Sequence, residues 1–152
     1  MNQTRPKLWK AWLPAVLWLG VIALESTNLG GADNTSKILY PLLHFLFGLN
    51  LFQFEHWHHY IRKCGHFFGY AMLSWLLFRS WRASLPSMRR WTLRWAAIAF
   101  AMTALVASLD EWHQTFLPSR TGRWQDVVLD SIAALTVQVF LWMVLRHKRA
   151  VE

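Results

Sequence analysis

The chain of 152 residues has room for one domain of ordinary size and not for two. It is 55% hydrophobic with 11 Trp and 10 Phe, yet it carries a formal net charge of +8. The aromatic content argues against a disordered chain and against a simple basic nucleic-acid module, so no nucleic-acid partner is expected. The single cysteine, Cys64, excludes an internal disulfide and a multi-cysteine zinc site.

Four apolar stretches, over residues 9–29, 60–78, 91–109 and 127–145, predict membrane-spanning helices. Each is close to the roughly 20 residues that a spanning helix needs. A soluble bundle of buried helices would show one wide polar face on each helix, whereas residues 95–109 are apolar or small on every side. Tryptophans also gather near the ends of the stretches, as in interfacial aromatic belts. We therefore expect an all-α membrane protein, a four-transmembrane-helix bundle in one domain over residues 1–152, with the lipid bilayer as its partner.

The apolar segment 38–54, between the first two stretches, is harder to assign. Its polar and small positions recur at helical spacing, which is typical of an interfacial or re-entrant helix. If it spanned the membrane, the best five-span arrangement would place nine basic residues inside and seven outside. With four spans the numbers are eleven and five, a clear positive-inside bias. We therefore expect an extra interfacial or re-entrant helix between spans 1 and 2, with both termini in the cytoplasm. The first stretch is expected to be a span rather than a cleaved signal peptide, because a good cleavage site is lacking.

Acidic and histidine residues are gathered on the opposite, outer side. Seven of the eight acids and six of the seven histidines lie there, although the positive-inside rule concerns mainly Lys and Arg. Several of them lie within the predicted helices, where ionisable residues are costly, face the bundle interior and usually mark function. The polar stripes at helical spacing are Lys63, His66, Tyr70 and Ser74 on the second span, and Thr103, Ala107, Asp110 and Gln114 on the third, with His113 beside it.

The fourth predicted helix begins with two acids, Asp126 and Asp130, at i and i+4. Like charges at this spacing repel, so they require nearby cations or a protonated partner. Arg120 and Arg123 precede them, and arginines at a helix N-terminus favour an anion. Glu25 ends the first span in the same layer. We therefore expect one polar pocket at the outer ends of the spans.

Three blocks of residues resemble the VanZ-like family of small bacterial membrane proteins. They are Glu25 and Ser26; Lys63, His66, Phe67 and Tyr70; and Asp110, Glu111, His113, Gln114, Phe116, Pro118 and Arg120, followed by Asp126. The family usually has Asn at the position of Asp130, which is a departure in this chain. The resemblance implies a location in the bacterial cytoplasmic membrane and a link to resistance against teicoplanin-type glycopeptide antibiotics.

The first functional hypothesis is a non-enzymatic protein whose outer pocket binds a cell-envelope ligand, namely a glycopeptide, a lipopeptide or a lipid headgroup. Its ligand-binding candidates are Glu25, Lys63, Tyr70, Asp110, Gln114, Arg120 and Asp126. For Tyr70, as for Ser74 and Gln138, an interhelical hydrogen bond is the simpler expectation.

The alternative is a membrane hydrolase or transferase that acts on a lipid-linked phosphate at the outer leaflet. His66 or His113 would transfer the proton and Glu111 would orient that histidine, as in general acid–base catalysis. A zinc site is a third possibility, because His66, Asp110, Glu111 and His113 are suitable ligands by type. Their spacing lacks the helical pair of histidines at i and i+4, so neither a metal nor any other cofactor is assigned.

Overall fold

The computed structural model describes residues 8–85, 87, 90–118 and 120–146, and every regular element in these ranges is helical. The prediction of an all-α protein is therefore confirmed. The elements are α1 (Leu8–Ser26), the short 3-10 helix η1 (Asn28–Gly30), α2 (Ala32–Phe47), α3 (Leu51–Ser84), α4 (Leu93–Gln114) and α5 (Trp124–Leu145).

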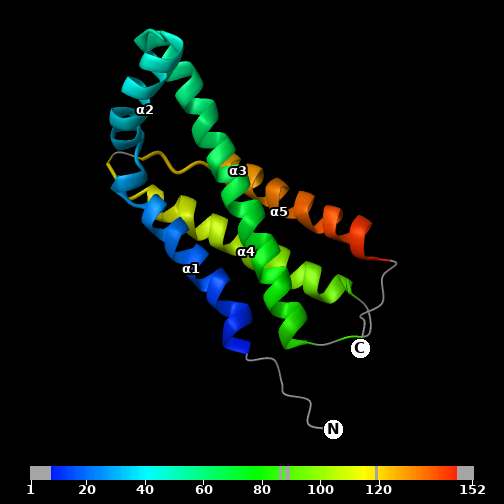
Figure 1. Ribbon diagram of the computed structural model, residues 1–152. Helices are drawn as coiled ribbons and strands as arrows, with labels where there is room; N and C mark the ends of the chain where they lie inside the picture. The colour runs from blue at the N-terminus through cyan, green and yellow to red at the C-terminus, as the bar shows by residue number, and fades with distance from the viewer. Residues whose placement is uncertain (1–7, 86, 88–89, 119, 147–152) are drawn as a thin grey trace.

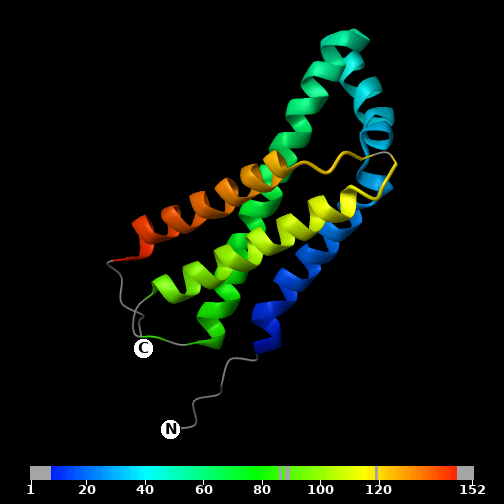
Figure 2. The same cartoon turned by 180° about the vertical axis from the view of Figure 1, so that it is seen from behind.

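Helix α3 is the central element and contacts all four other α-helices (Figures 1 and 2). Its 34 residues make it about 51 Å long at 1.5 Å per residue. α1 and α2 follow one another along its side, and both run antiparallel to it (Figure 1). α1 and α4 end, and α5 begins, at the same end of the bundle, which we call the site end. The hairpin of α2 and the first turns of α3 projects beyond this end.

The predicted helix over residues 38–54 has the wrong boundaries, because the structure divides this segment into two helices. α2 ends at Phe47 and is capped by Gly48, whose φ of 66° lies in the left-handed region that favours glycine. Asn50 then caps α3 in a capping box: its side chain accepts from the Gln53 amide at 2.9 Å, and the Gln53 side chain accepts from the Asn50 amide at 3.1 Å. The predicted second span accordingly belongs to a helix that begins at Leu51 rather than near residue 60.

Three described helices, α1, α4 and α5, are long and apolar enough to cross a membrane by length and composition; α3 is not among them. Large apolar side chains on their outer faces are exposed, for example Leu17 (62%) on α1 and Phe140 (58%) on α5. Such exposure would be unfavourable in water and fits a lipid bilayer. The chain therefore has the character of a membrane protein.

Small residues allow the helices to approach closely at the centre of the bundle, as is common between helices in membranes. The small buried residues are Ala96, Ala99, Thr103 and Ala107 on α4, and Ala133 and Ala134 on α5. Hydrogen bonds add to this packing: Ser74 Oγ donates to the Ala134 carbonyl at 3.1 Å, and Gln138 Nε2 donates to Ser74 Oγ at 2.7 Å. The predicted interhelical bonds of Ser74 and Gln138 are thus confirmed.

Candidate functional site

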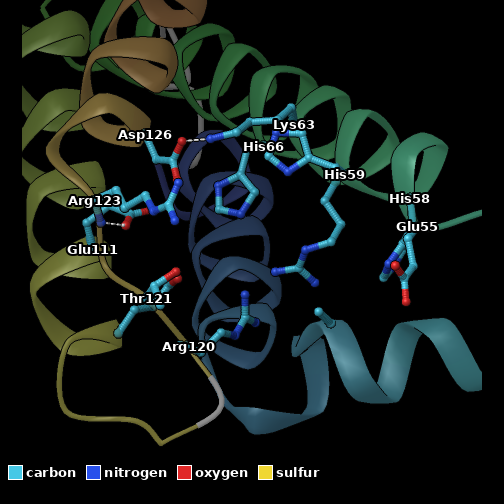
Figure 3. A pocket seen from close by; sticks show the side chains of 13 residues that line it. Glu55, His58, His59, Lys63, His66, Glu111, Arg120, Thr121, Arg123 and Asp126 are labelled. Atoms are coloured by element: carbon cyan, nitrogen blue, oxygen red, sulfur yellow. Dashed lines mark hydrogen bonds and ion pairs between the residues drawn. The ribbon is translucent and has the colours of Figure 1, made fainter. Parts of the chain in front are cut away.

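A cavity of about 310 Å³ opens at the site end, between α3, the end of α4, the α4–α5 loop and the start of α5 (Figure 3). Six of the ten residues predicted as ligand-binding or catalytic line it. They are Lys63, His66, Glu111, Gln114, Arg120 and Asp126. The cavity is also lined by Ala32, Glu55, His58, His59, Arg62, Thr121 and Arg123. Segments far apart in the sequence therefore meet around one polar opening.

Lys63 on α3 and Asp126 on α5 form an ion pair on one side of the cavity (Figure 3). We call this side, with Lys63, Asp126 and Arg123, the upper part of the cavity. Their side chains are 32% and 18% exposed, so the pair is partly desolvated. Asp126 also lies in the first turn of α5, where the helix dipole favours a carboxylate. The pair supplies one of the cations that the close spacing of Asp126 and Asp130 requires.

The α4–α5 loop is tied to the cavity by Glu111, which is buried near the end of α4. Its Oε2 accepts the backbone N–H of Arg123 at 2.8 Å, which satisfies the first amide before α5. Gly122 makes this approach possible, because a Cβ at its position would collide with the Glu111 carbonyl oxygen and the Thr115 methyl group. The tight loop places the Arg123 side chain at the cavity.

His66 lines the cavity at its floor, and Asp130 lies next to His66 without being part of the lining. Asp130 is fully buried (0% exposed), and its Oδ2 lies 3.6 Å from His66 Nδ1. Within the described part of the chain neither carboxylate oxygen of Asp130 has a hydrogen-bond partner. Glu111 completes the group, because one ligand-type atom from each of the three residues lies within 4.8 Å of the other two. These are the residues that could hold a metal ion. The sequence candidates omit Asp130, because the family resemblance did not extend to it.

Tyr70 and Asp110 lie beneath the cavity and do not line it. The Tyr70 hydroxyl donates to Asp110 Oδ2 at 2.7 Å, and both residues are buried. This bond joins α3 to α4, so the simpler expectation for Tyr70, an interhelical hydrogen bond, is confirmed. The Tyr70 ring also stacks on that of His66, with 6.3 Å between the centroids.

Glu25 and His113 lie on the α1 side, outside the cavity. Arg120 Nη2 donates to the carbonyl oxygens of Glu25 and Thr27, the latter at 3.0 Å, and thereby satisfies free carbonyls at the end of α1. His113 Nδ1 is hydrogen-bonded to Ser26 Oγ at 2.9 Å. The structure thus gives these two candidates a place in the α1 junction and does not bring His113 to His66.

Three residues of the hairpin, His58, His59 and Arg62, reach the cavity although they are not among the sequence candidates. Arg62 Nη1 donates to the Gly30 carbonyl at 2.7 Å, and His58 Nε2 is hydrogen-bonded to Thr35 Oγ1 at 2.9 Å. Burial, and then the Arg62 charge, lower the pKa of His58. A predicted helix that began at Leu51 rather than near residue 60 would have identified them, because it places His58, His59 and Arg62 on the same helix as His66.

The charged side chains that line the cavity differ in whether they have a partner. Four Lys and Arg side chains line it against three carboxylates. Of the carboxylates, Asp126 is paired with Lys63, and Glu111 accepts from the loop backbone. Neither Arg123 nor the third carboxylate, Glu55, has an ion-pair partner within the described residues, and the two lie on opposite sides of the cavity (Figure 3). The upper part of the cavity is therefore suited to an anion, which arginine binds with several donors at once.

The sequence profile of the VanZ/LLP1 family matches residues 11–146, a range that contains every residue lining the cavity. No curated protein and no solved structure matches the chain. Because the profile covers nearly the whole sequence, the chain belongs to the VanZ/LLP1 family.

Proposed function

We propose that α1, residues 60–78 of α3, α4 and α5 cross the bacterial cytoplasmic membrane as a single domain, with both termini in the cytoplasm. Support comes from the helix ends, because α1 begins and α5 ends at the end opposite the site end (Figures 1 and 2). The excess of basic residues in the sequence also lies on that side. α2 and the first turns of α3 would then form the interfacial element on the outer face.

On this topology the cavity opens at the outer membrane–water boundary, and its ligand is the phosphate-bearing headgroup of a cell-envelope lipid. The observation that carries the proposal is the convergence of Arg62, Lys63, Arg120 and Arg123 on one opening. Basic pockets between membrane helices bind anionic headgroups, because arginine matches the geometry of phosphate oxygens. Glycopeptides and lipopeptides fit less well, because Lys and Arg side chains outnumber carboxylates in the lining of the cavity.

The family resemblance implies a link to resistance against glycopeptide antibiotics. A protein that holds an envelope lipid by its headgroup would change the availability of that lipid at the membrane surface. We propose that such binding underlies the resistance that the family resemblance implies.

Binding is tested with the purified protein in neutral detergent and short-chain phosphatidylglycerol as the probe. A ligand that binds only the folded state raises the unfolding temperature. We expect such a rise with phosphatidylglycerol and not with phosphatidylcholine, and we expect Arg123→Gln to lose it. Arg94→Gln is the matched control, because Arg94 is exposed at the opposite end of α4 and should keep the full rise. Equal rises for both lipids, or an unchanged rise in Arg123→Gln, would contradict the proposal.

The convergence of His66, Glu111 and Asp130 favours a second candidate, a hydrolase or transferase acting on a lipid-linked phosphate. A histidine beside buried carboxylates is an arrangement used for proton transfer. Phosphate release from a panel of lipid phosphates tests it: an enzyme predicts turnover that is lost in His66→Ala while headgroup binding remains. His113→Ala should leave turnover unchanged, since that side chain lies outside the cavity.

A further inference from the structure

We infer that His66, Glu111 and Asp130 form a binding site for one divalent transition-metal ion, Zn²⁺ or Mn²⁺, at the floor of the cavity. This goes beyond the proposed binding of a headgroup, which uses the cationic upper part of the cavity. One nitrogen and two carboxylate oxygens are donors that both ions accept. Two of the three residues, His66 and Glu111, also line the cavity, from which further ligands can enter.

The distances between the three donor atoms are slightly longer than those between donors that hold a metal ion. The three donor atoms lie within 4.8 Å of one another, and His66 Nδ1 lies 3.6 Å from Asp130 Oδ2. Donors bound tetrahedrally at about 2.0–2.1 Å from Zn²⁺ stand about 3.4 Å apart. Side-chain adjustments of about 1 Å therefore suffice. Each donor comes from a different helix, so the backbone already fixes the relative positions.

Within the residues that the structure describes, the donor atoms of His66 and Asp130 also lack hydrogen-bond partners. Both oxygens of Asp130 and the Nδ1 of His66 are buried without a hydrogen-bond partner in the described part of the chain. A buried carboxylate with unmatched oxygens is costly, and it is stabilised by a cation or by hydrogen bonds. Lys63, the nearest lysine along α3, is paired with Asp126. Within the described residues, His66 is the basic side chain found within 4 Å of the Asp130 carboxylate, and Asp110 and Glu111 are buried as well.

An ion can reach this position, because His66 and Glu111 also line the open cavity. The ion would place positive charge directly beneath the cationic upper part. His66 would then be a metal ligand rather than the proton-transfer group of the hydrolase or transferase.

The test is metal binding by the full chain in detergent, with any affinity tag removed and after dialysis against EDTA. Isothermal titration with Zn²⁺ and loss of the free Mn²⁺ signal in electron paramagnetic resonance are the readouts. We expect one ion per chain. Asp130→Asn, Glu111→Gln and His66→Ala should each weaken binding by roughly 10–100-fold or more. His56→Ala is the matched control, since His56 is exposed on the same helix and outside the cavity, and it should bind as the wild type does.

If the variants fail to fold, measurements on the wild-type protein still test the inference. The wild-type protein loaded with Co²⁺ should show the d–d absorption of a mixed nitrogen and oxygen site, and its unfolding temperature should rise with the ion. Less than stoichiometric binding by the wild type, or binding that depends on His56 and not on Asp130, would overturn the inference. Because metal alone is the probe, a failure of headgroup binding would leave this result unaffected, and the reverse also holds.

Discussion

The hydroxyl group of Tyr70 donates a 2.7 Å hydrogen bond to Oδ2 of Asp110, and the other carboxylate oxygen of Asp110 has no partner within the described residues. This buried contact joins α3 to α4 directly beneath the cavity. Within the described residues, this is the one side-chain hydrogen bond that Asp110 accepts.

Tyr70→Phe should destabilise the protein by about 1–3 kcal/mol, because it leaves both oxygens of a buried carboxylate without a donor. Unfolding by sodium dodecyl sulphate in mixed micelles, followed by tryptophan fluorescence, measures the loss. Tyr60→Phe is the matched control, since Tyr60 is exposed on the same helix, and it should change stability by less than about 0.5 kcal/mol. Equal effects of the two substitutions would show that the Tyr70–Asp110 bond contributes nothing specific.

Gly122→Ala should displace the α4–α5 loop, because the added Cβ meets the Glu111 carbonyl oxygen and the Thr115 methyl group. The displacement would separate Arg123 from Glu111, so we expect headgroup binding to weaken together with stability. Gly20→Ala is the control: its Cβ meets nothing within 4 Å, and alanine within a helix should stabilise by up to about 1 kcal/mol. Unaltered phosphatidylglycerol binding by Gly122→Ala would contradict the role given to the loop.

A double-mutant cycle separates the structural and binding roles of Lys63 and Asp126. Lys63→Gln and Asp126→Asn should each cost stability, and the double variant should recover a coupling of about 0.5–1 kcal/mol, as expected for a partly exposed pair. Headgroup binding should not recover in the double variant, because Lys63 remains absent. Lys37→Gln, on the exposed side of α2, controls for the loss of a charge. A coupling of zero would mean that the ion pair does not stabilise the fold.

Stability should fall as the pH falls below about 6.5, the ordinary pKa of histidine. Burial, then the charge of Arg62, hold the pKa of His58 below that value in the folded protein. At lower pH the unfolded chain binds a proton that folded His58 does not, so the contribution is complete above the unfolded pKa and is lost as the pH falls to the folded pKa. Unfolding temperatures between pH 5 and 8 measure this. His58→Gln should flatten the curve, whereas the exposed control His56→Gln should keep it; parallel curves would show that His58 is not responsible.

Local periodicity predicted the parts of the site that lie along one helix. Lys63 and His66 are neighbours on α3 because residues three apart share a face, and this follows from sequence alone. The same rule explains why His113 and Glu111 lie in different places: residues two apart on a helix point in different directions. One points to the cavity and the other to Ser26.

Relations between helices could not be predicted in this way. Whether Asp126 or Asp130 meets His66 depends on the rotation of α5 against α3, and spacing within α5 gives no information on it. The turn at Gly48 was missed for a different reason. The apolar residues of α2 and α3 run on through it, so only the left-handed glycine and the cap at Asn50 mark the break.

The long continuous α3 also carries the chain's single cysteine, Cys64, next to Lys63 and exposed. A thiol-reactive spin label therefore attaches to the native sequence at one position, with no residue replaced. Its collision rates with oxygen dissolved in lipid and with a water-soluble relaxation agent give the immersion depth of that position. The unaltered protein thus contains its own reference point for locating the cavity along the bilayer normal.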